Sequence, residues 1–103
     1  MIKICDLNEF NESNIITKEI NEKIVALVRI NGQIFAFDDE CTHEKYPLSH
    51  GMVEEKNRNP VLECSYHGTK FNLKDGRVLS LPATKPLKIY KTEIKNGEVW
   101  AEI

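Results

Sequence analysis

The chain has 103 residues, and its 14 lysines and arginines against 16 aspartates and glutamates leave a net charge of −2. This length suits one domain with one modest core, so we expect a single domain over residues 1–103. The charge offers no cationic surplus for a nucleic acid partner. The longest apolar run, Ile24–Val28, is far shorter than the roughly 20 residues of a membrane helix, and the first residues show no basic segment followed by an apolar one. We therefore expect a cytoplasmic protein with no nucleic acid or membrane partner.

Three hairpin signals organise the chain. In each, a dipeptide suited to a tight turn joins two runs rich in β-branched, apolar or aromatic residues. The three dipeptides are Asn31-Gly32, Asp75-Gly76 and Asn96-Gly97. After the last turn, alternation places Val99, Ala101 and Ile103 on one face of a strand and Trp100 and Glu102 on the other. A small chain with three hairpins predicts an all-β antiparallel sandwich or barrel.

The segment before the first turn also admits a helical interpretation. Ile20, Ile24 and Leu27 fall at helical spacing, whereas Val25 and Ile30 lie off that stripe. Because the Asn-Gly turn joins two runs of strand-like composition, we favour the hairpin.

Two cysteine-histidine boxes, Cys41-x-His43 and Cys64-x-x-His67, lie in the middle of the chain with 20 residues between them. Residues 38–70 show little regular alternation, so we expect loops mounted on a β scaffold. Each box offers one thiolate and one imidazole, so two loops that close on each other supply four ligands. Zinc is one candidate, although zinc modules usually pair like ligands with like. A two-iron centre, with both cysteines on one iron and both histidines on the other, suits the mixed boxes better.

The residues around the boxes carry a family resemblance. The stretch CTHEKYPLSHG, followed by CSYHGTKFNLKDGRVLSLPATKPLKIY, resembles the Rieske-type 2Fe-2S ferredoxins of bacterial aromatic-ring dioxygenase systems. The similarity runs from about residue 24 to the C-terminus. It implies a Rieske-like antiparallel sandwich or barrel with a loop-rich cluster-binding subdomain at about 38–70 and a covering loop at about 80–86. The ligands it implies for one 2Fe-2S cluster are Cys41 and Cys64 on a buried iron, and His43 and His67 on an outer iron near solvent.

Two departures from high-potential members of the superfamily bear on the reduction potential. Those relatives carry an extra disulfide at the places that Tyr46 and Tyr66 hold here. They also have two hydroxyl donors to sulfur at places corresponding to Thr69 and Phe71, of which only Thr69 can donate. Fewer donors stabilise the reduced cluster less, so we expect a potential toward the low end of roughly −150 to +300 mV.

The resemblance implies a one-electron carrier between a flavin-dependent ferredoxin reductase and a terminal oxygenase, and not an enzyme with its own substrate. Beyond the two boxes only His50 remains, too few histidines for a two-histidine, one-carboxylate iron site. Two alternatives stay open. The first is a small Rieske-like subunit of an assimilatory nitrite reductase, and the second is an interaction module stabilised by zinc. We expect Cys5 to be an inert buried thiol in an N-terminal strand and His50 to be a solvated loop histidine.

Overall fold

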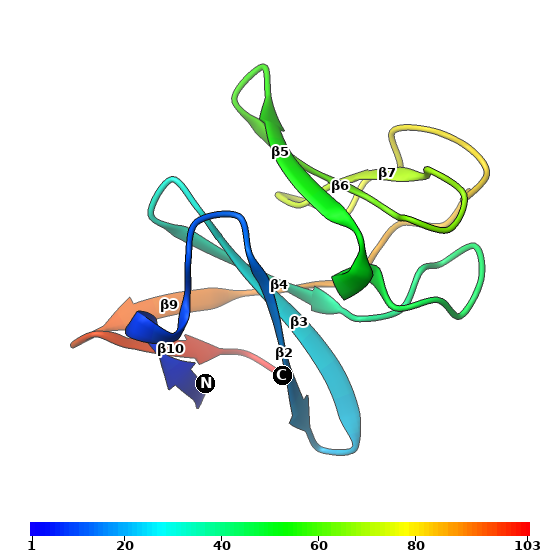
Figure 1. Ribbon diagram of the computed structural model, residues 1–103. Coiled ribbons are helices and arrows are strands. Elements are labelled where there is room, and N and C mark those ends of the chain that lie inside the picture. The colour runs from blue at the N-terminus through cyan, green and yellow to red at the C-terminus, as the bar shows by residue number, and fades with distance from the viewer.

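A computed structural model describes all residues, 1–103, and contains ten strands and two short 3-10 helices (Figure 1). The strands are β1 (Ile2–Asp6), β2 (Ile15–Ile20), β3 (Lys23–Ile30), β4 (Gln33–Asp38), β5 (Met52–Lys56), β6 (Asn59–Glu63), β7 (Lys70–Asn72), β8 (Ile89–Tyr90), β9 (Thr92–Lys95) and β10 (Glu98–Ala101). The 3-10 helices are η1 (Leu7–Glu9) and η2 (Leu48–His50). Neither helix has the length or the apolar character that crossing a membrane demands.

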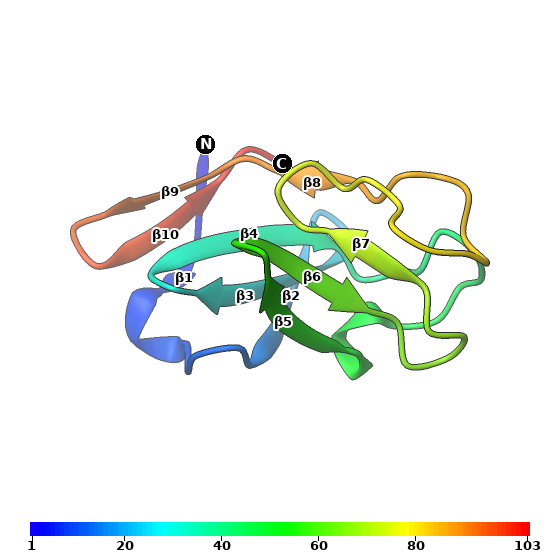
Figure 2. The same ribbon diagram turned by 90° about the horizontal axis from the view of Figure 1, so that it is seen from above.

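The strands form three antiparallel sheets, which confirms the all-β prediction. The central sheet has the order β2-β3-β4-β8, and the two others have the orders β1-β10-β9 and β5-β6-β7. In Figure 1, β3 and β4 run between the β9-β10 hairpin on one side and the β5-β7 sheet on the other. Figure 2 shows that the long connections after β4, β6 and β7 gather at one end of the molecule.

Two of the predicted hairpins form as expected. Asn31 and Gly32 take φ angles of 51° and 79° and join β3 to β4, with Ile30 opposite Gln33. The Asn-Gly turn at 96–97 joins β9 to β10 in the same way, with φ angles of 51° and 73°. Positive φ at both central positions gives the turn the twist that the flanking strands require.

The predicted hairpin at 75–76 forms, but it is shorter and its turn is wider than the two-residue turn expected. Phe71 and Val78 form an isolated antiparallel bridge beside β7. On either side of it, the Asn72 N–H donates to the Arg77 carbonyl at 2.8 Å and the Leu79 N–H donates to the Lys70 carbonyl at 2.7 Å. Gly76 is also held from outside the turn, because its carbonyl accepts a 2.8 Å hydrogen bond from the Leu87 N–H.

Two further hairpins have weaker signals in the sequence. Asn21 and Glu22 join β2 to β3, and Asn57 and Arg58 join β5 to β6, all with positive φ. The glycine that marks the other turns is missing at the second position, so only the asparagine hints at a turn. The expectation of loops throughout 38–70 is therefore wrong for the β5-β6 hairpin, which separates the two boxes.

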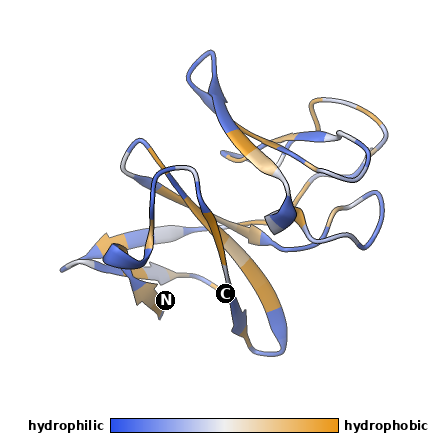
Figure 3. Cartoon of the chain, viewed as in Figure 1, coloured by the Kyte–Doolittle hydropathy of each residue, from blue (hydrophilic) through white to orange (hydrophobic).

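Strand β3 is buried on both faces and divides the interior into two cores. Ala26 and Val28 belong to a core shared with the β5-β7 sheet, whereas Val25 and Leu27 belong to a core shared with the β1-β10-β9 sheet. All four side chains are fully buried. Figure 3 shows the corresponding apolar colour along β3 and polar colour at the hairpin turns. A run buried on both faces hides the alternation of a half-buried strand, which explains why it also resembles a helix.

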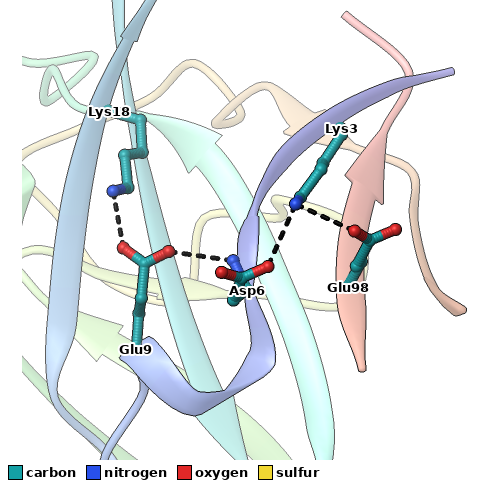
Figure 4. Close-up of polar contacts among 5 residues, drawn as sticks. All are labelled: Lys3, Asp6, Glu9, Lys18 and Glu98. Atoms are coloured by element: carbon teal, nitrogen blue, oxygen red, sulfur yellow. Dashed lines mark hydrogen bonds and ion pairs between the residues drawn. The ribbon is translucent and has the colours of Figure 1, made fainter. Parts of the chain in front are cut away.

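Ion pairs fasten the N-terminal segment to the rest of the molecule (Figure 4). Lys3 on β1 contacts Glu98 on β10 at 2.9 Å, and Glu9 in η1 contacts Lys18 on β2 at 2.7 Å. Between them, Cys5 on β1 is buried, and burial raises the pKa of its thiol. The prediction of a buried thiol in an N-terminal strand is confirmed.

Candidate metal centre

The first box lies in a loop that begins as β4 ends. The Cys41 N–H donates a 2.9 Å hydrogen bond to the Tyr46 carbonyl, which closes the loop on itself. The Asp39 carboxylate accepts hydrogen bonds from both the backbone N–H and the hydroxyl of Ser49, at 2.6 and 2.8 Å. These bonds fix both ends of the loop. As a result Cys41 lies in the interior with 5% of its surface exposed, while His43 lies outside.

The second box lies in a tighter turn that follows β6. The Cys64 N–H donates to the Thr69 carbonyl at 2.8 Å, and the Gly68 N–H donates back to the Cys64 carbonyl at 2.9 Å. Gly68 has a φ of 74°, a conformation that glycine adopts at no steric cost. Cys64 is 1% exposed and His67 is exposed. Like the first box, this box therefore has a buried cysteine and an exposed histidine.

The two thiols meet inside the molecule. Cys41 and Cys64 belong to one apolar core cluster, in which they lie close enough to affect each other's ionisation. Burial, together with Cys41 beside it, raises the pKa of the Cys64 thiol, whereas hydrogen bonds from the backbone N–H groups of Tyr66 and His67 act in the opposite direction. Two neighbouring buried thiolates need a cationic partner, since each disfavours ionisation of the other.

The two imidazoles meet at the surface. The ring centroids of His43 and His67 are 5.2 Å apart, with 64° between the ring planes. One nitrogen of each ring and a carboxylate oxygen of Glu44 lie within 4.8 Å of one another. The structure thus brings all four predicted ligands to one end of the molecule, with soft sulfur donors inside and nitrogen donors outside. This donor set fits a mixed-ligand iron-sulfur cluster.

A third loop, residues 80–86, is tied to both boxes. The Thr42 hydroxyl donates a 2.7 Å hydrogen bond to the Lys85 carbonyl, and the Ala83 N–H donates to the Thr69 hydroxyl oxygen at 3.2 Å. The Ser80 hydroxyl oxygen accepts a further bond from the Lys70 N–H at 3.0 Å. Sequence reasoning considered Thr69 only as a donor to sulfur and missed Thr42 and Ser80. Their contacts join segments far apart in the chain, which no local pattern reveals.

The remaining residues singled out in the sequence lie as follows. Phe71 is fully buried in the same core as the two thiols. His50 is exposed at the end of η2, as predicted, and the edge of its ring faces Tyr46, with 5.8 Å between the ring centroids. Tyr46 is partly buried, whereas half of the surface of Tyr66 is exposed.

Comparisons with known proteins agree with this geometry. The Rieske [2Fe-2S] domain family matches residues 1–91. The ferredoxin subunit of 3-phenylpropionate/cinnamic acid dioxygenase from Photorhabdus laumondii subsp. laumondii is 34% identical over 100 residues, covering 97% of this chain and 91% of that protein. The subunit of the same name from Escherichia coli K12 is 32% identical over 80 residues, covering 78% of this chain and 73% of that protein.

Solved structures share the fold. A chain in the complex of reduced oxygenase and oxidised ferredoxin in carbazole 1,9a-dioxygenase has a TM-score of 0.86 and 31% identity, covering 98% of this chain and 100% of that chain. A putative nitrite reductase NADPH small subunit has a TM-score of 0.88 and covers 99% of this chain and 97% of that chain, but its 24% identity shows the fold alone. The chain therefore belongs to the Rieske [2Fe-2S] family and is a Rieske-type ferredoxin, an electron-transfer protein with an iron-sulfur cluster.

Proposed function

We propose that the two boxes hold one 2Fe-2S cluster, with Cys41 and Cys64 on the inner iron and His43 and His67 on the outer iron. The observation that carries this proposal is the convergence of two buried thiols and two exposed imidazoles from separate loops. When bound, such a cluster supplies one-electron redox chemistry at a potential set by its ligands and their hydrogen bonds. The backbone N–H groups of Tyr66 and His67, which hydrogen-bond to the Cys64 sulfur, stabilise negative charge there.

The chain's own residues also control access to the cluster. The apolar core around Cys41 and Cys64 excludes water from the inner side, and the third loop, 80–86, covers the site from another side. The two imidazoles are exposed, so the shortest path for an electron to a partner runs through their edges. This arrangement supports a carrier that receives and releases electrons at one end of the molecule.

The proposed partners are a flavin-dependent ferredoxin reductase, which donates the electron, and a terminal oxygenase, which accepts it. The names of the dioxygenase ferredoxin relatives support this role. So does the solved complex, in which a similar chain accompanies an oxygenase. We expect a transient contact below about 1,200 Å² in total, as is usual for redox encounters. The three free cysteines support a reducing compartment, and we propose the cytoplasm.

The test is metal analysis with electron paramagnetic resonance (EPR) on protein that is purified anaerobically and reduced with dithionite. Two irons per chain, and hyperfine coupling from ¹⁵N-labelled histidine in a rhombic spectrum, are expected. A colourless protein with one zinc per chain would replace the carrier by a zinc-stabilised interaction module, because zinc has no redox chemistry. Electron transfer to a sirohaem nitrite reductase, in preference to a ring-hydroxylating oxygenase, would favour the nitrite reductase subunit.

A further inference from the structure

Four aromatic contacts link five rings across the two boxes. Tyr66 stacks on His67 with ring centroids 4.1 Å apart and 17° between the planes. Tyr46 stacks on Tyr66 at 5.0 Å and 27°. His43 meets His67, and His50 meets Tyr46, both edge to face. Tyr66 is therefore the middle ring of a stack, with His67 and Tyr46 as its two neighbours.

This stack is a direct link between two loops that share no backbone hydrogen bond. Each loop closes on itself, through the bond from Cys41 N–H to Tyr46 and the bond from Cys64 N–H to Thr69. Each loop is also tied to the third loop, 80–86. No backbone hydrogen bond runs from the first loop to the second. The edge contact of the two imidazoles and the Tyr46-Tyr66 pair are ring contacts that do join them.

Because Tyr66 also stacks on His67, the Tyr46-Tyr66 pair affects the orientation of that imidazole as well. A stacked ring restricts rotation of the imidazole of His67, because turning that imidazole out of plane would break the contact. Tyr46 is in turn held by the hydrogen bond that its carbonyl accepts from the Cys41 N–H and by packing against the core cluster. The core thus fixes Tyr46, Tyr46 fixes Tyr66, and Tyr66 fixes the orientation of the exposed imidazole of His67.

We propose that Tyr46 and Tyr66 act as an aromatic clamp, in which Tyr66 is a positioning residue for His67 and Tyr46 anchors Tyr66 to the first loop. The inference rests on the proposed function, since it takes His67 as a ligand of the cluster. In both tyrosines the aromatic ring, and not the hydroxyl, makes the contacts of the clamp. The side-chain hydroxyls that hydrogen-bond around the site belong to Thr42, Ser49, Thr69 and Ser80, and to neither tyrosine.

The experiment compares the cluster-loaded wild type with Tyr46→Leu, Tyr66→Leu, the double leucine variant, and the matched controls Tyr46→Phe and Tyr66→Phe. Leucine keeps apolar bulk and loses the ring, whereas phenylalanine keeps the ring and loses the hydroxyl. The first readout is the rate at which an iron chelator bleaches the visible absorbance. Tyr46→Leu should bleach about 2- to 12-fold faster than wild type, the range expected for the one aromatic pair that it removes between the loops. Tyr66→Leu, which also removes the stack on His67, should bleach at least as fast as Tyr46→Leu. The double variant should bleach more slowly than the product of the two single effects predicts, because the two residues share one contact.

The second readout separates positioning from general stability. In Tyr66→Leu the ¹⁵N hyperfine coupling of one histidine should change and broaden, while Tyr66→Phe should reproduce the wild-type spectrum. Wild-type coupling in Tyr66→Leu would overturn the positioning role, and fully multiplicative bleaching rates would overturn the clamp. Phenylalanine variants as impaired as the leucine variants would also overturn it, since the ring would then not suffice. A wild-type protein without two irons would refute the proposed function and the clamp together, whereas an intact wild-type signal with unaffected leucine variants would refute the clamp alone.

Discussion

Replacing Thr69 by valine tests how the third loop is held over the proposed cluster site. Thr69 is fully buried, and its hydroxyl oxygen accepts the hydrogen bond from the Ala83 N–H at 3.2 Å. Valine has nearly the same shape, so the packing changes little. The change leaves the Ala83 N–H, in a residue with 1% exposure, without its partner. An unsatisfied buried donor costs about 1 to 3 kcal/mol.

The assay is hydrogen exchange, read by mass spectrometry on the peptide that contains residues 80–86. If the loop opens locally, that cost corresponds to exchange about 5- to 150-fold faster in Thr69→Val than in wild type. The matched control is Thr69→Ser, which keeps the acceptor oxygen and loses only a methyl group. Exchange in Thr69→Val at the wild-type rate would refute the reasoning, as would equal acceleration in both variants, because the methyl group would then carry the effect.

Three further results are expected. The midpoint potential should lie toward the low end of the Rieske range, and a redox titration that gives a value above about +100 mV would contradict this. Burial, and then the hydrogen bond to Asp38, raises the pKa of Tyr90 to about 12. Since an unfolded tyrosine ionises near pH 10, stability on the order of 2 kcal/mol that is present below about pH 10 should be lost as the pH rises through 12. Denaturation of Tyr90→Phe should lack this alkaline loss, and equal slopes in both proteins would exclude the tyrosine as its cause. Gly76→Ala should abolish folding, because its Cβ would lie 1.9 Å from the Leu87 carbonyl oxygen at a φ of +82°. Gly32→Ala, at a φ of +79° in open space, should cost only about 1 to 2 kcal/mol, and similar melting temperatures for the two variants would show that the contact with Leu87 is not decisive.

The fold was predictable where a local signal coincides with the final structure. Two Asn-Gly dipeptides identified two hairpins, because both positions of the turn need positive φ and both residues accept it. The Asn21-Glu22 and Asn57-Arg58 turns have the same geometry without glycine, so tertiary contacts rather than local preference select them. The hairpin at Asp75-Gly76 was also predictable, but its width was not, because only Gly76 takes a positive φ and the Gly76 N–H donates back to the Asn72 carbonyl.

The candidate site follows the same rule. Residue types and spacing identified the four candidate ligands, since each box is local in sequence. The contacts that shape the site were not predictable, because they join distant segments. The Thr42 hydroxyl reaches Lys85, and backbone N–H groups, which have no sequence signature, reach the Cys64 sulfur. The stacking of Tyr46 on Tyr66 depends equally on how the two loops face each other.

The division of the interior by β3 has a consequence for maturation of the protein. The two cysteines proposed to hold the cluster, Cys41 and Cys64, belong to the core that β3 shares with the β5-β7 sheet. The other core, with the buried Val25, Leu27 and Val99, joins the two ends of the chain and contains none of them. We therefore expect this second core to depend less on cluster insertion than the core beneath the two boxes. In protein without the cluster, hydrogen exchange should be faster around Cys41 and Cys64 than in β1 and β10, and equal acceleration in both regions would contradict this.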